Sequence, residues 1–216
     1  MRLVLLGPPG VGKGTQARQV AEALGIPQVA TGNILRDAVQ LGTPLGNQAD
    51  TYMKRGALVP DDVMIGIIQE RLKKDDCRDG FVLDGFPRTV EQTRALEGVL
   101  GESGWKLDRA VLFTAPRETI VDRLSGRRTC ADCGAAYHLK LNPPPGGGDM
   151  CGLCGGRLVQ RADDVPATIL QRLEVYEKQT APLAAEYRRK GLLEEVPAGG
   201  TVTAIFDDVM QRLRRV

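Results

Sequence analysis

Residues 3–15 of this chain read LVLLGPPGVGKGT, and this stretch decides the fold. It begins with a short apolar run at residues 3–6, which is typical of a strand buried on both faces of a sheet. After the glycines, apolar residues recur at helical spacing from Ala17 to Leu24, and Gly25 ends the predicted helix. A buried strand, a glycine-rich turn and a helix predict the start of a β-α-β unit.

Strand-like and helical patterns alternate along most of the remaining sequence. Further strand-like runs lie at residues 28–30, 81–83, 110–114 and 192–196. Helical patterns cover residues 63–73, 90–100, 117–124, 167–189 and 204–214. Strands that alternate with helices predict an α/β fold, in which helices flank a parallel sheet.

Two segments interrupt this alternation. Residues 31–59 predict two or three short helices without a strand, and residues 127–164 contain four cysteines and the run PPPGGG at 143–148. Proline and glycine at that density predict a loop. We therefore expect a core domain made of residues 1–29, 60–126 and 165–216, with insertions at 30–59 and 127–164 on the ligand side of the sheet.

The composition excludes several classes of function. The 216 residues include 29 lysines and arginines and 27 aspartates and glutamates, so the formal net charge is only +2. A general nucleic-acid-binding protein usually has a strong basic excess, and a membrane-spanning helix needs about 20 apolar residues in succession. The sequence shows neither feature, nor an exposed oligomerisation stripe. We expect a cytoplasmic monomer without nucleic-acid or membrane partners.

The glycine-rich turn has the G-x4-G-K spacing of a P-loop. Its backbone N–H groups turn toward a phosphate chain at a helix start, where the dipole favours anions, and Lys13 reaches the outer phosphates. A plain glycine-rich turn with a surface lysine is the alternative, which the flanking strand and helix disfavour. Gly14 follows Lys13, and the hydroxyl that often ligates Mg²⁺ arrives one place later, at Thr15. We expect nucleotide phosphates and water to hold most of the Mg²⁺.

Four of the five cysteines form two CxxC pairs, Cys130 with Cys133 and Cys151 with Cys154. Two such pairs at this distance are typical of a tetrahedral zinc site, and nearby glycines allow turns that aim N–H groups at sulfur. Two disulfides are the alternative, which a reducing compartment disfavours. Four thiolates leave no position for water, so we expect the zinc to be structural. We interpret Cys77 as a plain thiol.

Over essentially its whole length the sequence resembles the adenylate kinases of the long-lid bacterial type. The segment DGFPR at 84–88, which follows an apolar strand, is highly specific for that family, and so is QTAPL at 179–183. The other landmarks are the P-loop variant, Thr31-Gly32 with Arg36, GALVP at 56–60, Gln92, Arg123, Arg127, Arg161 with Asp163-Asp164, and Arg172. The resemblance implies a P-loop nucleoside monophosphate kinase fold, an AMP-binding segment at 30–59 and a zinc-binding lid at 127–164. It also implies reversible phosphoryl transfer between ATP and AMP to give two ADP.

The resemblance further implies the residues of each site. The ATP site would comprise Gly10, Val11, Gly12, Lys13, Gly14, Thr15, Arg127, Ala136, Tyr137 and Gly200. The AMP site would comprise Thr31, Arg36, Ala57, Leu58, Val59, Gly85, Phe86, Pro87, Arg88, Gln92, Arg161 and Arg172. Within it, Arg88 would bind the AMP phosphate and Gln92 would read the adenine edge. The catalytic residues would be Lys13, Asp84, Arg88, Arg123, Arg161 and Arg172, and the four paired cysteines would hold Zn²⁺.

Elementary chemistry supports these assignments. Phosphoryl transfer needs in-line positioning and positive charge, and arginine binds phosphate oxygens through two hydrogen bonds while staying charged. Arg123 and Arg127 are four residues apart, which predicts a shared helical face, although surface salt bridges are the alternative for any single arginine. Asp84 ends a strand and is expected to orient Mg²⁺ through water. The AMP phosphate is already nucleophilic, so no general base is required, and we interpret His138 as structural.

Some alternatives remain open at this stage. Asp163 and Asp164 could polarise Arg161, form a hinge of the lid or cap the next helix. A kinase for another nucleoside monophosphate, or one that uses GTP, is the nearest rival function, because base choice depends on few contacts. A zinc-ribbon nucleic-acid-binding module on a P-loop scaffold is a rival from another class, although acidic residues balance the basic ones in 127–164.

Overall fold

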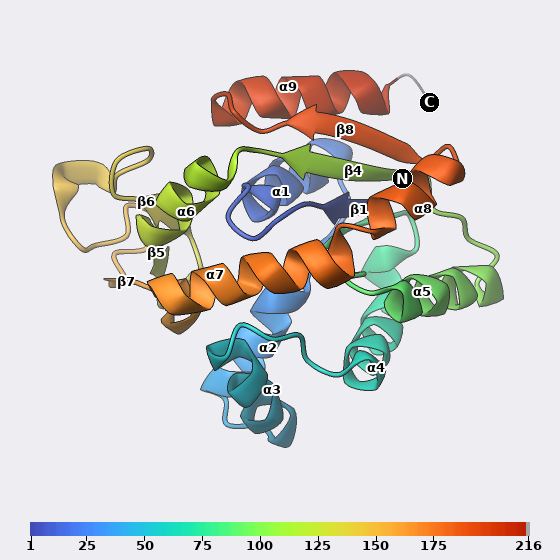
Figure 1. Ribbon diagram of the computed structural model, residues 1–216, viewed down its shortest axis with the longest axis horizontal. Helices are drawn as coiled ribbons and strands as arrows, with labels where there is room; N and C mark the ends of the chain where they lie inside the picture. Colours follow the sequence, from blue (N-terminus) through green and yellow to red (C-terminus); the bar gives the residue numbers. More distant parts are fainter. Residues whose placement is uncertain (215–216) are drawn as a thin grey trace.

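The computed structural model describes residues 1–214, and its centre is a five-stranded parallel sheet (Figure 1). The strands are β1 (Arg2–Leu6), β2 (Gln28–Ala30), β3 (Phe81–Asp84), β4 (Arg109–Thr114) and β8 (Leu193–Pro197). Their spatial order is β2-β3-β1-β4-β8, and every neighbouring pair is parallel. The predicted α/β class is confirmed, and the strands lie close to their expected positions.

Helices cover both faces of the sheet because the side chains of β1 alternate between two apolar clusters. On one face, α1 (Lys13–Leu24) and α9 (Val202–Leu213) pack against Leu3 and Leu5. On the other face, α4 (Asp61–Leu72), α5 (Val90–Glu102) and α8 (Leu183–Arg189) pack against Val4 and Leu6. These four side chains are at most 3 % exposed, as the apolar run at residues 3–6 predicts.

Residues 30–59 form the α2–α3 segment, which contains the short helices expected there. The helices are α2 (Thr31–Gln40) and α3 (Pro44–Lys54). Leu35 of α2 and Ala49 of α3 are buried in the same apolar cluster as Val4 and Leu6 of the central sheet. The α2–α3 segment is therefore continuous with the main core.

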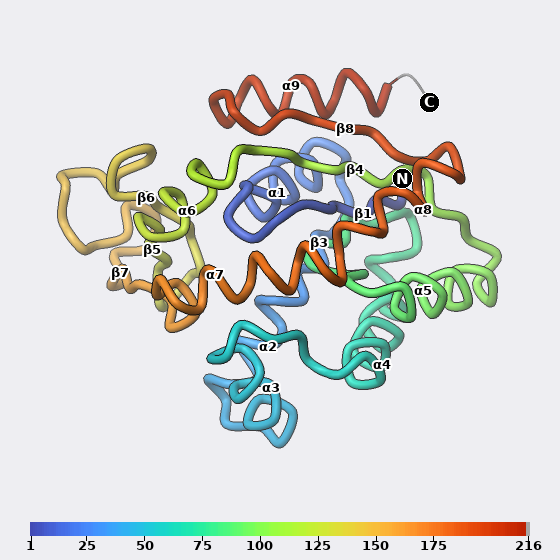
Figure 2. The backbone as a smooth tube through the Cα atoms, in the orientation of Figure 1, coloured from blue at the N-terminus to red at the C-terminus, as the bar shows by residue number. Residues whose placement is uncertain are grey.

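Residues 127–164 form the lid segment, which projects from the core at a different place from the α2–α3 segment (Figure 2). It contains the strands β5 (Arg127–Cys130), β6 (Ala136–His138) and β7 (Leu158–Val159), paired antiparallel in the order β6-β5-β7. The run at 143–148 forms no strand, as its prolines and glycines predict, whereas the three strands of this segment were not predicted. Strands of two to four residues are too short to show a period in the sequence, whereas the glycines and prolines between them stand out.

Two further expectations are corrected. The helix predicted over 167–189 is interrupted: α7 (Pro166–Val175) leads into a π-helical stretch, Tyr176–Thr180, and α8 begins only after Pro182. Proline has no backbone N–H and cannot continue an α-helical ladder. Arg123 and Arg127 do not share a helical face, because α6 (Arg117–Ser125) ends before Gly126 and Arg127 begins β5.

Short 3-10 turns complete the chain at Asp75–Cys77, Pro145–Gly147 and Ala162–Asp164. Cys77 lies fully buried in the core, and this burial raises the pKa of its thiol to about 11, which agrees with the interpretation of a plain thiol. Among residues 1–214, no helix combines the length and the apolar character that a membrane crossing requires.

The fold brings the predicted site residues to one edge of the sheet. The P-loop follows β1, Asp84 is the last residue of β3, and α6 follows β4. The carboxyl ends of parallel strands share one edge, where open α/β sheets bind their ligands. The α2–α3 segment follows β2 in the sequence, and the lid segment follows α6. Both therefore begin next to this edge of the sheet.

Candidate active site

The P-loop wraps around the side chain of Lys13. The Nζ of Lys13 donates to the backbone oxygens of Gly7 at 2.7 Å and Pro8 at 2.9 Å. Burial lowers the pKa of Lys13 to about 7, and Asp84 opposes this shift only in part. A polyphosphate at the loop would favour the ammonium form, because an adjacent anion stabilises the charged lysine.

Gly10 shows why the loop needs glycine. Its φ of 82° lies in the left-handed region, and a Cβ at this position would approach Leu124 Cγ to 2.5 Å. The loop therefore packs closely against α6, the helix that also carries Arg123. Arg123 donates from Nη1 to the backbone oxygen of Val11 at 3.1 Å and from Nη2 to that of Ala198 at 2.8 Å. These contacts hold its guanidinium beside the P-loop.

A cavity of about 1040 Å³ opens in front of the P-loop. Its lining contains every residue that the resemblance assigns to ATP: Gly10, Val11, Gly12, Lys13, Gly14, Thr15, Arg127, Ala136, Tyr137 and Gly200. Arg123, Arg161 and Asp84 also line it. Residues from β1, β3, α6, the lid segment and the start of α9 thus converge on one space.

A second cavity, of about 80 Å³, lies beside the first, between the α2–α3 segment and the core. From the predicted AMP set, its lining includes Thr31, Arg36, Ala57, Leu58, Val59, Gly85, Arg88, Gln92 and Arg172. Arg36, Arg88 and Arg172 line both cavities, so the two spaces meet at a group of guanidinium groups.

Three predicted AMP residues lie elsewhere. Pro87 and Arg161 line the larger cavity, whereas Phe86 lines neither. The side chain of Phe86 is 1 % exposed and belongs to the main apolar core. Its position in the DGFPR motif is explained by anchoring the turn between Asp84 and Arg88 rather than by contact with the cavity.

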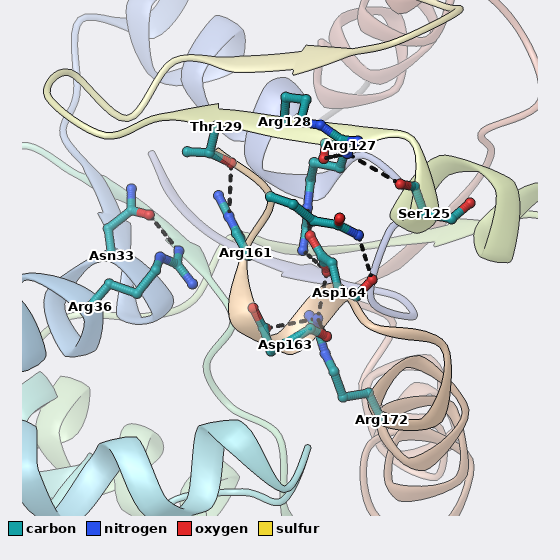
Figure 3. Close-up of polar contacts among 11 residues, drawn as sticks. Asn33, Arg36, Ser125, Arg127, Arg128, Thr129, Arg161, Asp163, Asp164 and Arg172 are labelled. Atoms are coloured by element: carbon teal, nitrogen blue, oxygen red, sulfur yellow. Dashed lines mark hydrogen bonds and ion pairs between the residues drawn. The ribbon is translucent and has the colours of Figure 1, made fainter. Parts of the chain in front are cut away.

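Figure 3 shows the ion pairs that connect the lid segment to Arg172 of α7 at the junction of the two cavities. Asp164 is fully buried and accepts from Arg127 at 2.6 and 2.7 Å and from Arg172 at 3.1 Å. Arg172 also pairs with Asp163 at 2.8 Å. The structure thus places the two aspartates between Arg127 and Arg172, and Arg161 instead donates to the Thr129 hydroxyl at 3.0 Å.

The guanidinium groups are held in a poorly solvated place. Burial lowers the pKa of Arg161 to about 9, and it also lowers the pKa values of Arg36, Arg88 and Arg172. Their mutual repulsion adds to this effect, and Asp163 and Asp84 oppose it. An anionic ligand at the junction would remove part of this penalty, because it supplies the missing opposite charge.

Gln92 belongs to a hydrogen-bond network that the sequence interpretation missed. Its Nε2 donates to Asp61 Oδ1 at 2.8 Å, and its Oε1 accepts from the Arg88 backbone N–H at 2.8 Å. The Thr89 hydroxyl donates to Asp61 Oδ2 at 2.8 Å and accepts from the Gln92 backbone N–H at 3.1 Å. The only sequence signal for Asp61 is its place directly after the GALVP motif at 56–60.

The four paired cysteines converge as a metal site requires. One sulfur from each residue lies within 4.8 Å of the others, and the Sγ–Sγ separations are 3.5 Å for Cys130–Cys154 and 3.6 Å for Cys133–Cys151. Disulfide sulfurs would lie about 2.05 Å apart, whereas tetrahedral Zn²⁺ with bonds of about 2.3 Å places sulfurs roughly 3.8 Å apart. The cluster therefore fits a metal such as zinc.

The chain around the cysteines supports thiolate ligands. Gly134 and Gly155 directly follow the two CxxC pairs and have φ values of 71° and 75°, which close each turn in the left-handed region. The Leu153 N–H donates to Cys151 Sγ at 3.4 Å. The Tyr137 hydroxyl also lies 3.4 Å from this sulfur, where it can donate to a thiolate.

His138 connects the lid segment to α6 through hydrogen bonds of its imidazole ring. It is 8 % exposed, its Nε2 lies 3.2 Å from the backbone oxygen of Asp122, and its Nδ1 accepts from the N–H groups of Lys140 and Leu141. Both ring nitrogens are thus used within the chain, which agrees with the structural interpretation.

The fold and the site are those of a P-loop nucleoside monophosphate kinase. The adenylate kinase family model matches residues 5–192. The adenylate kinase of Moorella thermoacetica is 52 % identical over 100 % of this chain and 99 % of its own length. The adenylate kinase of a Geobacter species is 53 % identical over 99 % of this chain and 100 % of its own length. A third, from a Geobacillus species, is 50 % identical over 99 % of this chain and 98 % of its own.

The chain belongs to the adenylate kinase family. Its activity is that of the family: ATP and AMP are converted to two ADP. The prediction from the sequence motifs is confirmed at this level, whereas the roles of individual residues stay predictions.

Proposed function

We propose that ATP binds in the larger cavity with its phosphates on the P-loop, and that AMP binds in the smaller cavity. The observation that carries this assignment is the shared lining: Arg36, Arg88 and Arg172 border both spaces, next to Lys13. Two nucleotides placed this way would point their phosphates at the same group of cations. The phosphoryl group could then pass directly from ATP to AMP, without a covalent intermediate on the protein.

The reaction follows from this placement. An oxygen of the AMP phosphate attacks the γ-phosphorus of ATP, the bond to the β-phosphate oxygen breaks, and ADP leaves. Lys13, Arg123, Arg161 and Arg172 stabilise the charge on the transferred group, and preorganised cations of this kind dominate such catalysis. Arg88 holds the AMP phosphate in line.

Magnesium is the cofactor proposed to enter with ATP. A Cβ at Gly14 would lie 3.2 Å from Asp84 Oδ2, so this carboxylate faces the residues that follow Lys13. Asp84 would hold water molecules of the hydrated ion, which suits a cation that keeps several waters. The ion supplies positive charge to the β- and γ-phosphates when bound.

The four cysteines are proposed to hold Zn²⁺ as a structural ion. Four thiolates fill a tetrahedral site, so the ion offers no position for water or phosphate. The lid segment would then serve as a rigid cover that brings Arg127 and Tyr137 over ATP and keeps water from accepting the phosphoryl group. We further propose that the protein acts as a monomer in the cytoplasm, with small nucleotides and not nucleic acid as partners.

Binding titrations with two variants test the placement of the nucleotides. Arg88→Ala should weaken AMP binding while changing ATP affinity less than about threefold, or roughly 0.6 kcal/mol. Lys13→Met should instead reduce kcat by about 100- to 1000-fold in a folded protein, because it removes a preorganised cation. Equal loss of both nucleotides in Arg88→Ala, or near wild-type turnover in Lys13→Met, would refute the assignment.

A further inference from the structure

Asp61 does not line the proposed AMP cavity itself, but it contacts Gln92, which does. It is the first residue of α4, two positions after Val59, which lines the smaller cavity with Ala57 and Leu58. Its two carboxylate oxygens are divided between Gln92 Nε2 and the Thr89 hydroxyl, at 2.8 Å each. Gln92 itself is 2 % exposed and lines the cavity.

These contacts permit only one orientation of the Gln92 amide. A carboxylate can only accept hydrogen bonds and a backbone N–H can only donate. The NH₂ group of Gln92 must therefore face Asp61, and its oxygen must face the Arg88 N–H, as the distances of 2.8 Å and 2.8 Å require. A reversed amide would set oxygen against carboxylate and NH₂ against N–H, which leaves buried polar groups unpaired.

One N–H and one oxygen lone pair of the amide remain free for a ligand. Because the amide has one orientation, the positions of this donor and this acceptor are fixed. The Watson–Crick edge of adenine offers the complement, with the N1 acceptor beside the 6-amino donor. Hypoxanthine and guanine reverse this order, since N1 carries hydrogen and the 6-position is a carbonyl acceptor. Placed in the same position, they would oppose donor to donor and acceptor to acceptor.

We propose that Asp61 is a specificity-determining positioning residue: it locks the amide of Gln92 and thereby makes the site select 6-aminopurine over 6-oxopurine nucleotides. This inference rests on the proposed AMP site. Thr89 completes the lock, because its hydroxyl donates to Asp61 and caps α5 by accepting from the Gln92 backbone. The carboxylate acts together with the Arg88 N–H: it excludes the Gln92 oxygen from its side of the amide, which a neutral polar side chain would not do.

The test compares AMP with IMP as phosphoryl acceptors at saturating ATP. IMP differs from AMP at the 6-position and the adjacent N1 without adding a 2-amino group. Asp61→Asn should lower the ratio of kcat/KM for AMP over IMP by roughly tenfold or more, because asparagine can also donate and no longer excludes the Gln92 oxygen, so that only the Arg88 N–H still favours the original amide orientation. The loss should appear in the KM for AMP, with kcat at saturating AMP kept within about threefold.

Two further variants control this experiment. Asp62→Asn changes the neighbouring, exposed acid and should leave the ratio unchanged. Asp61→Glu keeps the carboxylate, so it should retain the preference for AMP even where its longer arm raises KM. An Asp61→Asn protein with the wild-type ratio, or one in which AMP and IMP lose activity by the same factor, would overturn the proposal.

Gln92→Ala separates the failure of this inference from the failure of the proposed AMP site. If Gln92→Ala leaves the AMP-to-IMP ratio unchanged, Gln92 does not read the base, and the placement of AMP in this cavity fails with the inference. If Gln92→Ala lowers the ratio but Asp61→Asn does not, the AMP site stands and only the role of Asp61 is refuted.

Discussion

The two insertions beside the site differ in what keeps them folded. The α2–α3 segment buries Leu35 and Ala49 in the main core cluster, so its packing is shared with the central sheet. The lid segment has a separate small cluster, made of Cys130, Ala135, Cys151 and Leu158, against which Tyr137 packs. Two of those four buried residues are themselves predicted metal ligands.

The lid segment also leaves much of its apolar surface in water. More than half of the residue surface is exposed at Leu139, Leu141, Met150 and Leu153. A segment of this size cannot bury enough apolar area to fold alone and commonly depends on a metal or disulfide. The difference teaches that a segment with a separate small apolar cluster draws little stability from the main core, and that a metal at the four cysteines would supply stability locally.

The largest expected effect comes from removing the metal ligands with Cys130→Ser and Cys133→Ser. Without zinc, cleavage by a protease near residues 143–148 should rise on the order of 100-fold, because the free energy of local opening falls by about 3 kcal/mol or more. Metal analysis, limited proteolysis and the thermal midpoint measure the outcome. Activity well below the melting temperature should survive in part, because bound nucleotide still selects closed lids.

Cys77→Ser is the matched control, because it makes the same chemical change in the main core. It should leave the zinc content and the rate of lid cleavage unaltered. A zinc-free double variant with an unchanged cleavage rate would show that the lid segment is held by packing, like the α2–α3 segment. Complete loss of turnover in a folded, nucleotide-bound variant would contradict a purely structural zinc.

The second effect concerns the base of the lid segment, where Asp164 joins Arg127 to Arg172. Asp164→Ala should reduce the free energy of unfolding by about 3 kcal/mol, since it leaves the half-buried Arg127 without its carboxylate partner and Arg172 with Asp163 alone. The control lies in the α2–α3 segment, where the Asp50–Lys54 pair is 33 % and 62 % exposed. Asp50→Ala should cost less than about 0.5 kcal/mol.

Urea unfolding of both variants gives the two free energies. Similar small losses would mean that the charged contacts at the lid base contribute no more than a surface pair. The contrast between the two segments would then rest on the metal alone.

The smallest effect tests the packing of the α2–α3 segment. A Cβ at Gly46 would lie 2.0 Å from the backbone oxygen of Ala38, so α2 and α3 touch through this glycine. Gly46→Ala should lower the free energy of unfolding by about 1–3 kcal/mol through overpacking. Gly98→Ala on α5, where a Cβ meets no atom within 4 Å, should instead raise it by about 0.5–1 kcal/mol. A gain in stability from Gly46→Ala would show that the two helices move apart freely.

The motifs of short range predicted much of this protein. Alternating strands and helices, the P-loop spacing and the two CxxC pairs each depend on residues that are neighbours in the sequence, and the fold class and family are confirmed. The lid strands escaped prediction because they span only two to four residues. The shared helical face of Arg123 and Arg127 was wrong because Gly126 separates a helix from a strand.

The sequence by itself determined the α/β class, the phosphate-binding loop and the presence of a four-cysteine cluster, because each follows from local spacing and residue chemistry. Only the tertiary structure decided which charged groups meet. Asp61 contacts Gln92 across 31 residues, and Arg127 contacts Asp164 across 37. Such pairs leave no periodic signal in the sequence, since their distance is set by how separate elements pack around the sheet and not by the local geometry of the chain.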